Sequence, residues 1–198
     1  MMRRAILAWI AWVDGLTERL GRLVSWCAFL LVILVCLDVG LRYLFALSFV
    51  AFRELEWHLF ALLFLLGAAS TLKRDGHVRV DVLYQRLGPR SRAAINVAGC
   101  LLFLFPGCYL VIATALPFVQ QAWAIREGSP DPGGLPARYL LKGVIPAAFG
   151  LLALQGVAFF LRNLCVLFGV DCGRRRPGPQ AGDGAAAGKR RAAGGGIS

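Results

Sequence analysis

The longest uncharged stretch of this 198-residue chain, residues 93–125, runs for 33 residues without a charged side chain. A helix needs about 20 apolar residues to cross a membrane, so this stretch is long enough for a span. Pro106 and Pro117 interrupt it. A tight hairpin would have to cross twice with about 16 residues each time, so we expect one kinked or tilted helix that ends near Pro117.

Three further apolar stretches repeat this pattern, and the composition agrees with it. Hydrophobic residues make up 58% of the chain and charged residues only 17%, whereas a soluble domain carries about a quarter charged residues. The sequence therefore predicts an all-α integral membrane protein. Its membrane domain is placed at 23–170, with four transmembrane helices at about 23–42, 54–72, 94–118 and 139–168.

Two segments outside the spans are typical of helices that lie at a membrane surface. In residues 1–22, apolar residues recur every three or four positions, and Trp9 and Trp12 suit the depth of the lipid headgroups. We expect an amphipathic interfacial helix here, with a plain extension of the first span as the alternative. A second interfacial helix is expected within 73–92, and the tail 171–198 has a disordered Gly/Ala/Arg composition.

Basic residues predict the orientation of the chain. Seventeen of the 22 Lys and Arg residues fall in the N-terminal segment, in 73–92 and at the C-terminal end, and only five fall on the other side. Positive charge is enriched in cytoplasmic segments, so both termini are predicted to be cytoplasmic. Topology thus accounts for much of the net charge of +11, and no nucleic-acid partner is needed.

Ionisable residues near the ends of the spans are the first candidates for functional positions. Asp38 and Arg42 are four residues apart, so they can pair at the end of the first span. Glu54 and Glu56 fall in the predicted first turn of the second span, where a helix N-terminus favours negative charge. Glu54 and His58 are also four apart and share one face of that helix.

The sequence lacks the motifs of a self-sufficient enzyme or redox protein. Its two histidines, His58 and His77, fall near opposite ends of one predicted helix, too far apart to ligate one haem. No CxxC pair, phosphate loop, nucleophile elbow or HExxH motif occurs. Five of the six cysteines lie inside predicted spans, where cysteine usually acts as a small apolar residue. We expect no disulfide, no metal site, no cofactor and no enzymatic activity in this chain.

Three short stretches carry a resemblance to a known family. They are RELEWHLF at 53–60, KRDGHVRVD at 73–81 and EGSPDPGGLP at 127–136. With these stretches, residues 23–162 resemble the DctQ-like small permease subunit of tripartite ATP-independent periplasmic (TRAP) transporters. Within that family, the chain resembles the branch often labelled mannitol/chloroaromatic compound transport.

The resemblance implies a division of labour in the bacterial inner (cytoplasmic) membrane. A periplasmic solute-binding protein (DctP-like) would capture an organic acid-like solute, and a large membrane subunit (DctM-like) would bind solute and Na+ and move them. This chain would stabilise the scaffold of the large subunit, in agreement with its apolar span interiors and the small residues at 67–71. The alternatives are a stand-alone four-helix channel or carrier and a membrane redox subunit.

Candidate contact residues follow from the same resemblance. Those for the subunit interface are Asp38, Arg42, Glu54, Glu56, Trp57, His58, His77, Arg79 and Asp81. The two glutamates alternatively only complement a helix start, and residues 77–81 alternatively form a solvated turn. The candidate periplasmic docking loop for the binding protein is carried by Glu127, Ser129, Asp131 and Arg138, and its alternative is a plain turn.

Overall fold

The computed structural model describes residues 2–73 and 87–169, and no strand occurs among them. The elements are α1 (Met2–Phe45), α2 (Val50–Lys73), α4 (Pro89–Gly99), the π-helical segment η1 (Cys100–Leu104), α5 (Phe105–Ala124) and α6 (Arg138–Leu167). Four helical stretches are long and apolar enough to cross a membrane: Leu7–Phe45, Val50–Lys73, Pro89–Ala124 and Arg138–Leu167. The predicted all-α fold with four transmembrane helices is confirmed.

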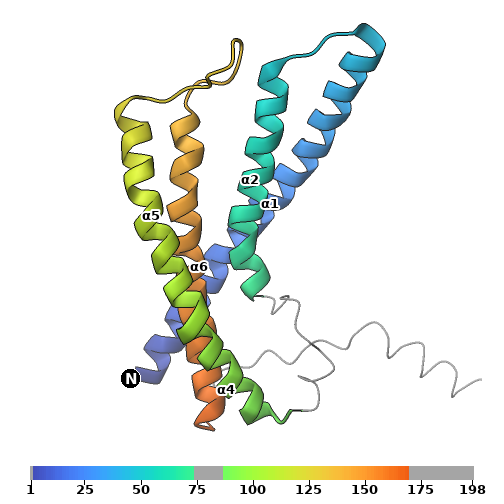
Figure 1. Cartoon of the computed structure of the whole chain (residues 1–198). Coiled ribbons are helices and arrows are strands. Elements are labelled where there is room, and N and C mark those ends of the chain that lie inside the picture. Colours follow the sequence, from blue (N-terminus) through green and yellow to red (C-terminus); the bar gives the residue numbers. More distant parts are fainter. Residues whose placement is uncertain (1, 74–86, 170–198) are drawn as a thin grey trace, which may run out of the picture.

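Helix α1 is continuous across the boundary at which we expected an interfacial helix to meet the first span. It has 44 residues and contains no proline that would break it. Its first part, residues 2–22, is called the N-terminal arm below. The arm packs against α6, where Ile10 and Val13 are buried together with Ala158. The arm thus extends the first span as one helix and belongs to the helix bundle (Figure 1).

Small residues bring α1 and α2 close together. A Cβ atom added at Gly21 would lie 3.0 Å from Oγ of Ser70, and one added at Gly67 would lie 3.8 Å from Cγ1 of Val24. Backbones can approach this closely only where side chains are small, which is a common device where helices pack in lipid. The small residues at 67–71 thus lie where α2 approaches α1.

The long uncharged stretch forms one interrupted helix and no hairpin. Helix α4 passes into η1 and then into α5, so helical structure runs from Pro89 to Ala124. The π-helical turn stands directly before Pro106, where the proline ring has no N–H to donate and crowds the preceding turn. The helix continues through Pro117, where we expected it to end.

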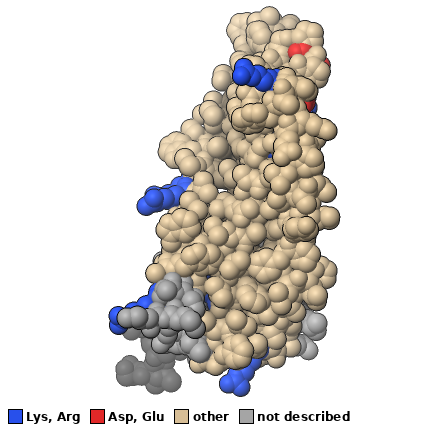
Figure 2. Space-filling view, turned by 90° about the vertical axis from the view of Figure 1, so that its left-hand side faces the viewer, with Lys and Arg blue, Asp and Glu red and all other residues tan. Residues whose placement is uncertain are grey.

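The helices form two hairpins that diverge at one end, as Figure 1 shows. Residues 46–49 join α1 to α2, and the loop 125–137 joins α5 to α6. The arm of α1 passes behind α6 at the opposite end. Much of the outer surface is apolar: Trp26 is 70% exposed and Phe29 is 59% exposed. On the face drawn in Figure 2, charged side chains are few and most lie towards the two ends.

The expectation of no disulfide is wrong for one cysteine. Cys165 is disulfide-bonded, whereas Cys27, Cys36 and Cys108 are free. Cys165 lies in the last turn of α6, which ends at Leu167, so it is at the edge of its span and not in the interior. The sequence places Cys165 inside a predicted span, where a disulfide is not expected.

Candidate functional site

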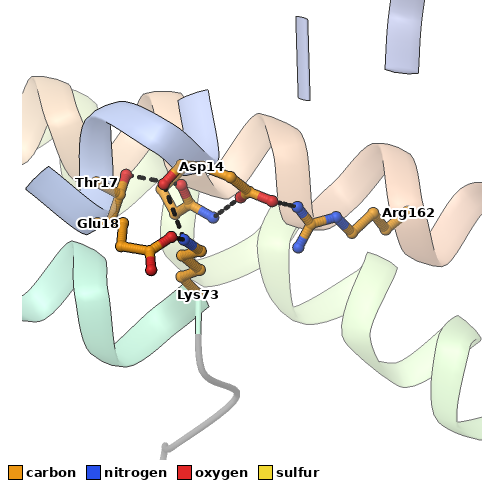
Figure 3. A network of polar contacts seen from close by, with 6 residues as sticks. Asp14, Thr17, Glu18, Lys73 and Arg162 are labelled. Carbon is orange, nitrogen blue, oxygen red and sulfur yellow. Dashed lines mark hydrogen bonds and ion pairs between the residues drawn. The ribbon is translucent and has the colours of Figure 1, made fainter. Parts of the chain in front are cut away.

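A network of polar side chains joins three helices at the end of the bundle where the arm crosses α6 (Figure 3). Its centre is the Asp14 carboxylate, which accepts hydrogen bonds from Arg162 Nη2 and, at 3.2 Å, from Gln155 Nε2. Thr17 donates from its hydroxyl to Gln155 Oε1 at 2.9 Å. Thr17 is 1% exposed and Gln155 is fully buried, so this bond has no competition from water.

Helix α2 is attached to the same network through its last residue. Lys73 donates from Nζ to the backbone carbonyl of Asp14 at 2.8 Å and pairs with the Glu18 carboxylate at 3.0 Å. The arm is therefore held by side chains of α6 on one side and of α2 on the other. We call the six residues the Asp14 network: Asp14, Thr17, Glu18, Lys73, Gln155 and Arg162.

A second polar cluster lies at the opposite end and centres on Glu54 of α2. Glu54 as a whole residue is 6% exposed, and its two carboxylate oxygens hold the loop 125–137 at two places. Ser129 donates from its hydroxyl to Oε1, and the backbone N–H of Leu135 donates to Oε2 at 2.6 Å. We call Glu54, Ser129 and Leu135 the Glu54 clasp, because they fasten the loop between α5 and α6 onto α2.

The loop under the clasp has an ordered backbone of its own. The N–H of Ser129 donates to the Leu135 carbonyl at 3.1 Å, and the N–H of Gly134 donates to the Asp131 carbonyl at 3.0 Å. A Cβ atom added at Gly134 would lie 2.9 Å from Glu54 Oε2 and closer still to the Ser129 side chain. The clasp therefore depends on the absence of a side chain at Gly134. Glu127 fixes the loop to α6 by an ion pair with Lys142.

An open cleft of about 420 Å³ lies beside the clasp, between the start of α2 and the loop. The guanidinium of Arg138 is 5.1 Å from the centroid of the Trp57 ring, a distance at which a cation and an aromatic face attract each other. Asp131 lies on the loop side of the cleft and is exposed. The lining residues are Val50, Arg53, Glu54, Trp57, Asp131, Pro132 and Arg138.

The structure brings together residues that the sequence placed in two separate groups. Glu54 and Trp57 were interface candidates, whereas Ser129, Asp131 and Arg138 were loop candidates, and all five belong to the clasp or its cleft. Glu54 also shares a face with His58 as predicted, since His58 Nδ1 is 2.6 Å from the Glu54 carbonyl oxygen.

Two expectations about the other candidates are wrong. Helix α2 begins at Val50, so Glu54 and Glu56 lie beyond its first turn and do not complement a helix start. Within the described residues Asp38 and Arg42 form no ion pair; Asp38 is 5% exposed, and the Arg42 guanidinium lies 5.5 Å from the ring centroid of Tyr43.

The remaining candidates are Glu56, Glu127 and the residues at 77–81. Glu56 Oε1 is buried and has no hydrogen-bond partner among the described residues. Glu127 is held by Lys142 and lies outside the cleft. The predictions for His77, Arg79 and Asp81, and for the second interfacial helix, fall outside the described residues. Among the residues that are described, no group of His, Cys, Asp and Glu has the arrangement of a metal site.

The two polar clusters lie one membrane thickness apart. Nineteen residues separate Glu54 from Lys73 on α2, which is about 28 Å at 1.5 Å per residue. The hydrocarbon core of a bilayer is about 30 Å thick. The polar contacts that tie the two hairpins together therefore match its two borders, and the interval between them is apolar.

Comparison with known proteins assigns the chain to a family. The model of the DctQ component of tripartite ATP-independent periplasmic transporters matches residues 31–166. The chain belongs to the DctQ family. A putative TRAP transporter small permease protein of Haemophilus influenzae (strain ATCC 51907 / DSM 11121 / KW20 / Rd) is 29% identical over 137 residues, which cover 67% of this chain and 83% of that protein.

Membership in the DctQ family settles the general role of the chain. It is a small subunit of a TRAP transporter and a multi-pass protein of the inner membrane. The family consists of transporter subunits and is not an enzyme family, and it implies association with a large membrane subunit and a solute-binding protein. The family match includes the Glu54 clasp, Gln155 and Arg162, whereas Asp14, Thr17 and Glu18 precede it.

Sequence reasoning missed the Asp14 network, although signals for it exist. Gln155 is a lone amide in an otherwise apolar stretch of α6, and Asp14 is an acid on a helix with strong apolar periodicity. Each needs a partner when buried. The partners are 141 and 148 residues away from Asp14 along the chain, so the sequence alone does not identify them.

Proposed function

We propose that this TRAP small subunit stabilises the scaffold of the large permease subunit during Na+-coupled uptake of an organic acid-like solute. The observation that carries the proposal is the placement of its charges. The charged side chains of the four helices gather at the two ends, and no Asp, Glu, Lys or Arg occurs in 57–72, 93–125 or 143–161. Polar groups along the interior would be needed to carry a solute across. The chain uses its polar groups to hold its helices together.

In this proposal both termini lie in the cytoplasm and the loop 125–137 lies in the periplasm. The support is the distribution of basic residues, 17 of 22 of which lie on the side of the termini. Solute and Na+ would bind in the large subunit, and no cofactor is proposed for this chain. The placement in the mannitol/chloroaromatic-type branch rests on the loop sequence at 127–136.

The proposed interface with the large subunit includes part of the exposed apolar surface of α1 and the candidates near it. Glu56 is one of these candidates, and its Oε1 is buried with no hydrogen-bond partner among the described residues. The other proposed contacts are Asp38, Arg42, Trp57, His58, His77, Arg79 and Asp81.

The loop 125–137 is proposed to dock the solute-binding protein. It lies at the end of the bundle assigned to the periplasm, and Asp131 and Pro132 at its tip are exposed. The clasp and the internal hydrogen bonds give the loop a defined shape, which lowers the entropic cost of binding a partner.

Reconstitution tests the proposed function. The chain, the large subunit and the binding protein are placed in proteoliposomes, and solute uptake is measured with and without an inward Na+ gradient. We expect uptake only when all three proteins and the gradient are present, and loss of uptake when this chain is left out. Solute or ion flux from the purified chain alone would overturn the proposal and favour a stand-alone channel or carrier.

The interface is tested separately by replacing Arg79 and Asp81 together with alanine. We expect less large subunit to co-purify with the tagged chain in mild detergent. A double replacement of Lys189 and Arg190 in the C-terminal tail is the matched control, since no interface role is proposed for that tail. Unchanged co-purification and uptake in the Arg79/Asp81 variant would refute their role.

A further inference from the structure

Glu54 was a candidate for contact with another subunit, yet the structure uses it inside the chain. Glu54 as a whole residue is 6% exposed, and both of its carboxylate oxygens are engaged by the loop. A partner protein therefore cannot reach it without first opening the clasp. If Glu54 matters for assembly, it acts through the groups that it holds.

Those groups belong to the surface that the loop presents. Ser129 and Leu135, which bond to Glu54, lie on either side of the loop tip, where Asp131 and Pro132 are exposed. The Ser129 hydroxyl also accepts a hydrogen bond from the Asp131 N–H at 3.2 Å. The carboxylate, Ser129 and the backbone of Asp131 thus form one connected set.

We propose that Glu54 is a positioning residue: it shapes the loop so that Asp131, Pro132 and Arg138 are presented to the solute-binding protein. This inference rests on the proposed docking role of the loop. The clasp also spans the two hairpins at the end where they diverge, because Glu54 belongs to one hairpin and the loop to the other (Figure 1). Release of the clasp would detach the loop from α2, and it would also allow the distance between the two hairpins to change.

The chemistry of the clasp provides a conservative variant. In Glu54→Gln the amide oxygen still accepts from the Leu135 N–H, and the amide NH2 donates to the Ser129 hydroxyl, which is able to accept. In Glu54→Ala both bonds are lost. A clasp made of hydrogen bonds therefore predicts loss with alanine and rescue with glutamine, whereas a role for the negative charge predicts loss in both.

The experiment uses the complex of this chain with the large subunit in nanodiscs. Amide hydrogen exchange is measured over residues 131–137, and affinity for the purified binding protein is measured separately. We expect Glu54→Ala to exchange about tenfold faster in this segment and to bind at least about fivefold more weakly. Glu54→Gln should stay within about threefold of the wild type in both measurements.

Two further variants keep the test decisive. Gly134→Ala leaves Glu54 in place but adds a Cβ atom 2.9 Å from its Oε2, so it should loosen the loop even if Glu54→Ala fails to fold. Glu18→Ala is the matched control: it removes a carboxylate that also pairs across two helices, but at the opposite end. It should change neither exchange at 131–137 nor binding.

The outcomes separate this inference from the docking proposal. Unchanged exchange in Glu54→Ala and Gly134→Ala would overturn the inference, and so would faster exchange with unchanged binding. Replacement of the exposed Asp131 and the half-buried Arg138, both with alanine, tests docking itself. If that double variant binds normally, the docking role of the loop fails; if it binds weakly while Glu54→Ala binds normally, only the positioning role fails.

Discussion

The buried hydrogen bond between Thr17 and Gln155 allows a quantitative test of the Asp14 network. Thr17→Val keeps the size and shape of the side chain but removes the hydroxyl that donates to Gln155 Oε1 at 2.9 Å. Because Gln155 is fully buried, the orphaned oxygen finds no water. Gln155→Leu removes the amide, and with it the bonds to Thr17 and Asp14, while nearly conserving volume, so the cost of a cavity stays small.

The size of the effect follows from where the pair lies. Leaving a buried polar group without a partner costs about 1–3 kcal/mol in soluble proteins, whereas hydrogen bonds between membrane helices average about 0.6 kcal/mol and reach about 1.7. Because both side chains are completely buried, we expect their hydrogen bond to be among the stronger ones measured between membrane helices. We expect each single variant to lose about 1–2 kcal/mol of unfolding free energy, and the double variant to lose about 1 kcal/mol less than their sum.

The assay is reversible unfolding in mixed detergent micelles, followed by circular dichroism for the wild type, both single variants and the double variant. Thr114→Val is the matched control, because the Thr114 hydroxyl is exposed and bonds only to carbonyls of its own helix. It should change stability by less than about 0.5 kcal/mol and be additive with Gln155→Leu. Additivity of Thr17→Val and Gln155→Leu within about 0.3 kcal/mol would refute the reasoning.

Two further predictions use the same unfolding assay. Gly156→Val should destabilise the chain by about 1–3 kcal/mol, because a Cβ atom at Gly156 would lie 2.5 Å from Cδ2 of Leu104; a stability equal to the wild type would show that the Leu104 side chain moves aside without cost. Lys73→Met should cost about 1–2 kcal/mol, since it also removes the bond to the Asp14 carbonyl. Glu18→Gln should cost less than about 1 kcal/mol because its side chain is 61% exposed, and equal costs for the two variants would contradict this ranking.

The sequence predicted the four helices because hydropathy is a local property. Runs such as 93–125 leave few alternatives to a span, and the length of that run, too short for two crossings, correctly predicted one helix and no hairpin. Helix ends were harder to predict. The stretch 43–52 has no proline or glycine, and Ser48 is its only helix-capping residue type, so the sequence does not show that the turn occupies only residues 46–49. Because α2 begins at Val50 and not near residue 54, Glu54 lies beyond its first turn. The predicted role of Glu54 at a helix start is therefore lost.

The sequence named several residues of the Glu54 clasp and its cleft as candidates, but not their arrangement, and it missed the Asp14 network. Glu54 and Ser129 were both candidates, yet 75 residues separate them in the chain, and their contact depends on how the two hairpins pack. The pairing of Asp14 with Arg162 has the same origin, at a separation of 148 residues. Composition and spacing indicate that a buried acid needs a partner, and only the fold selects which one.

Helix α2 has a special place in this arrangement, since it contributes to both polar clusters. In lipid the apolar faces of helices gain little by meeting each other, so specific contacts decide how the hairpins sit together. Glu54 and Lys73 supply such contacts at the two ends of α2, about 28 Å apart. On α6 the corresponding positions, Arg138 and Arg162, are 24 residues or about 36 Å apart. If both pairs mark the borders of one bilayer, α6 must be more tilted than α2.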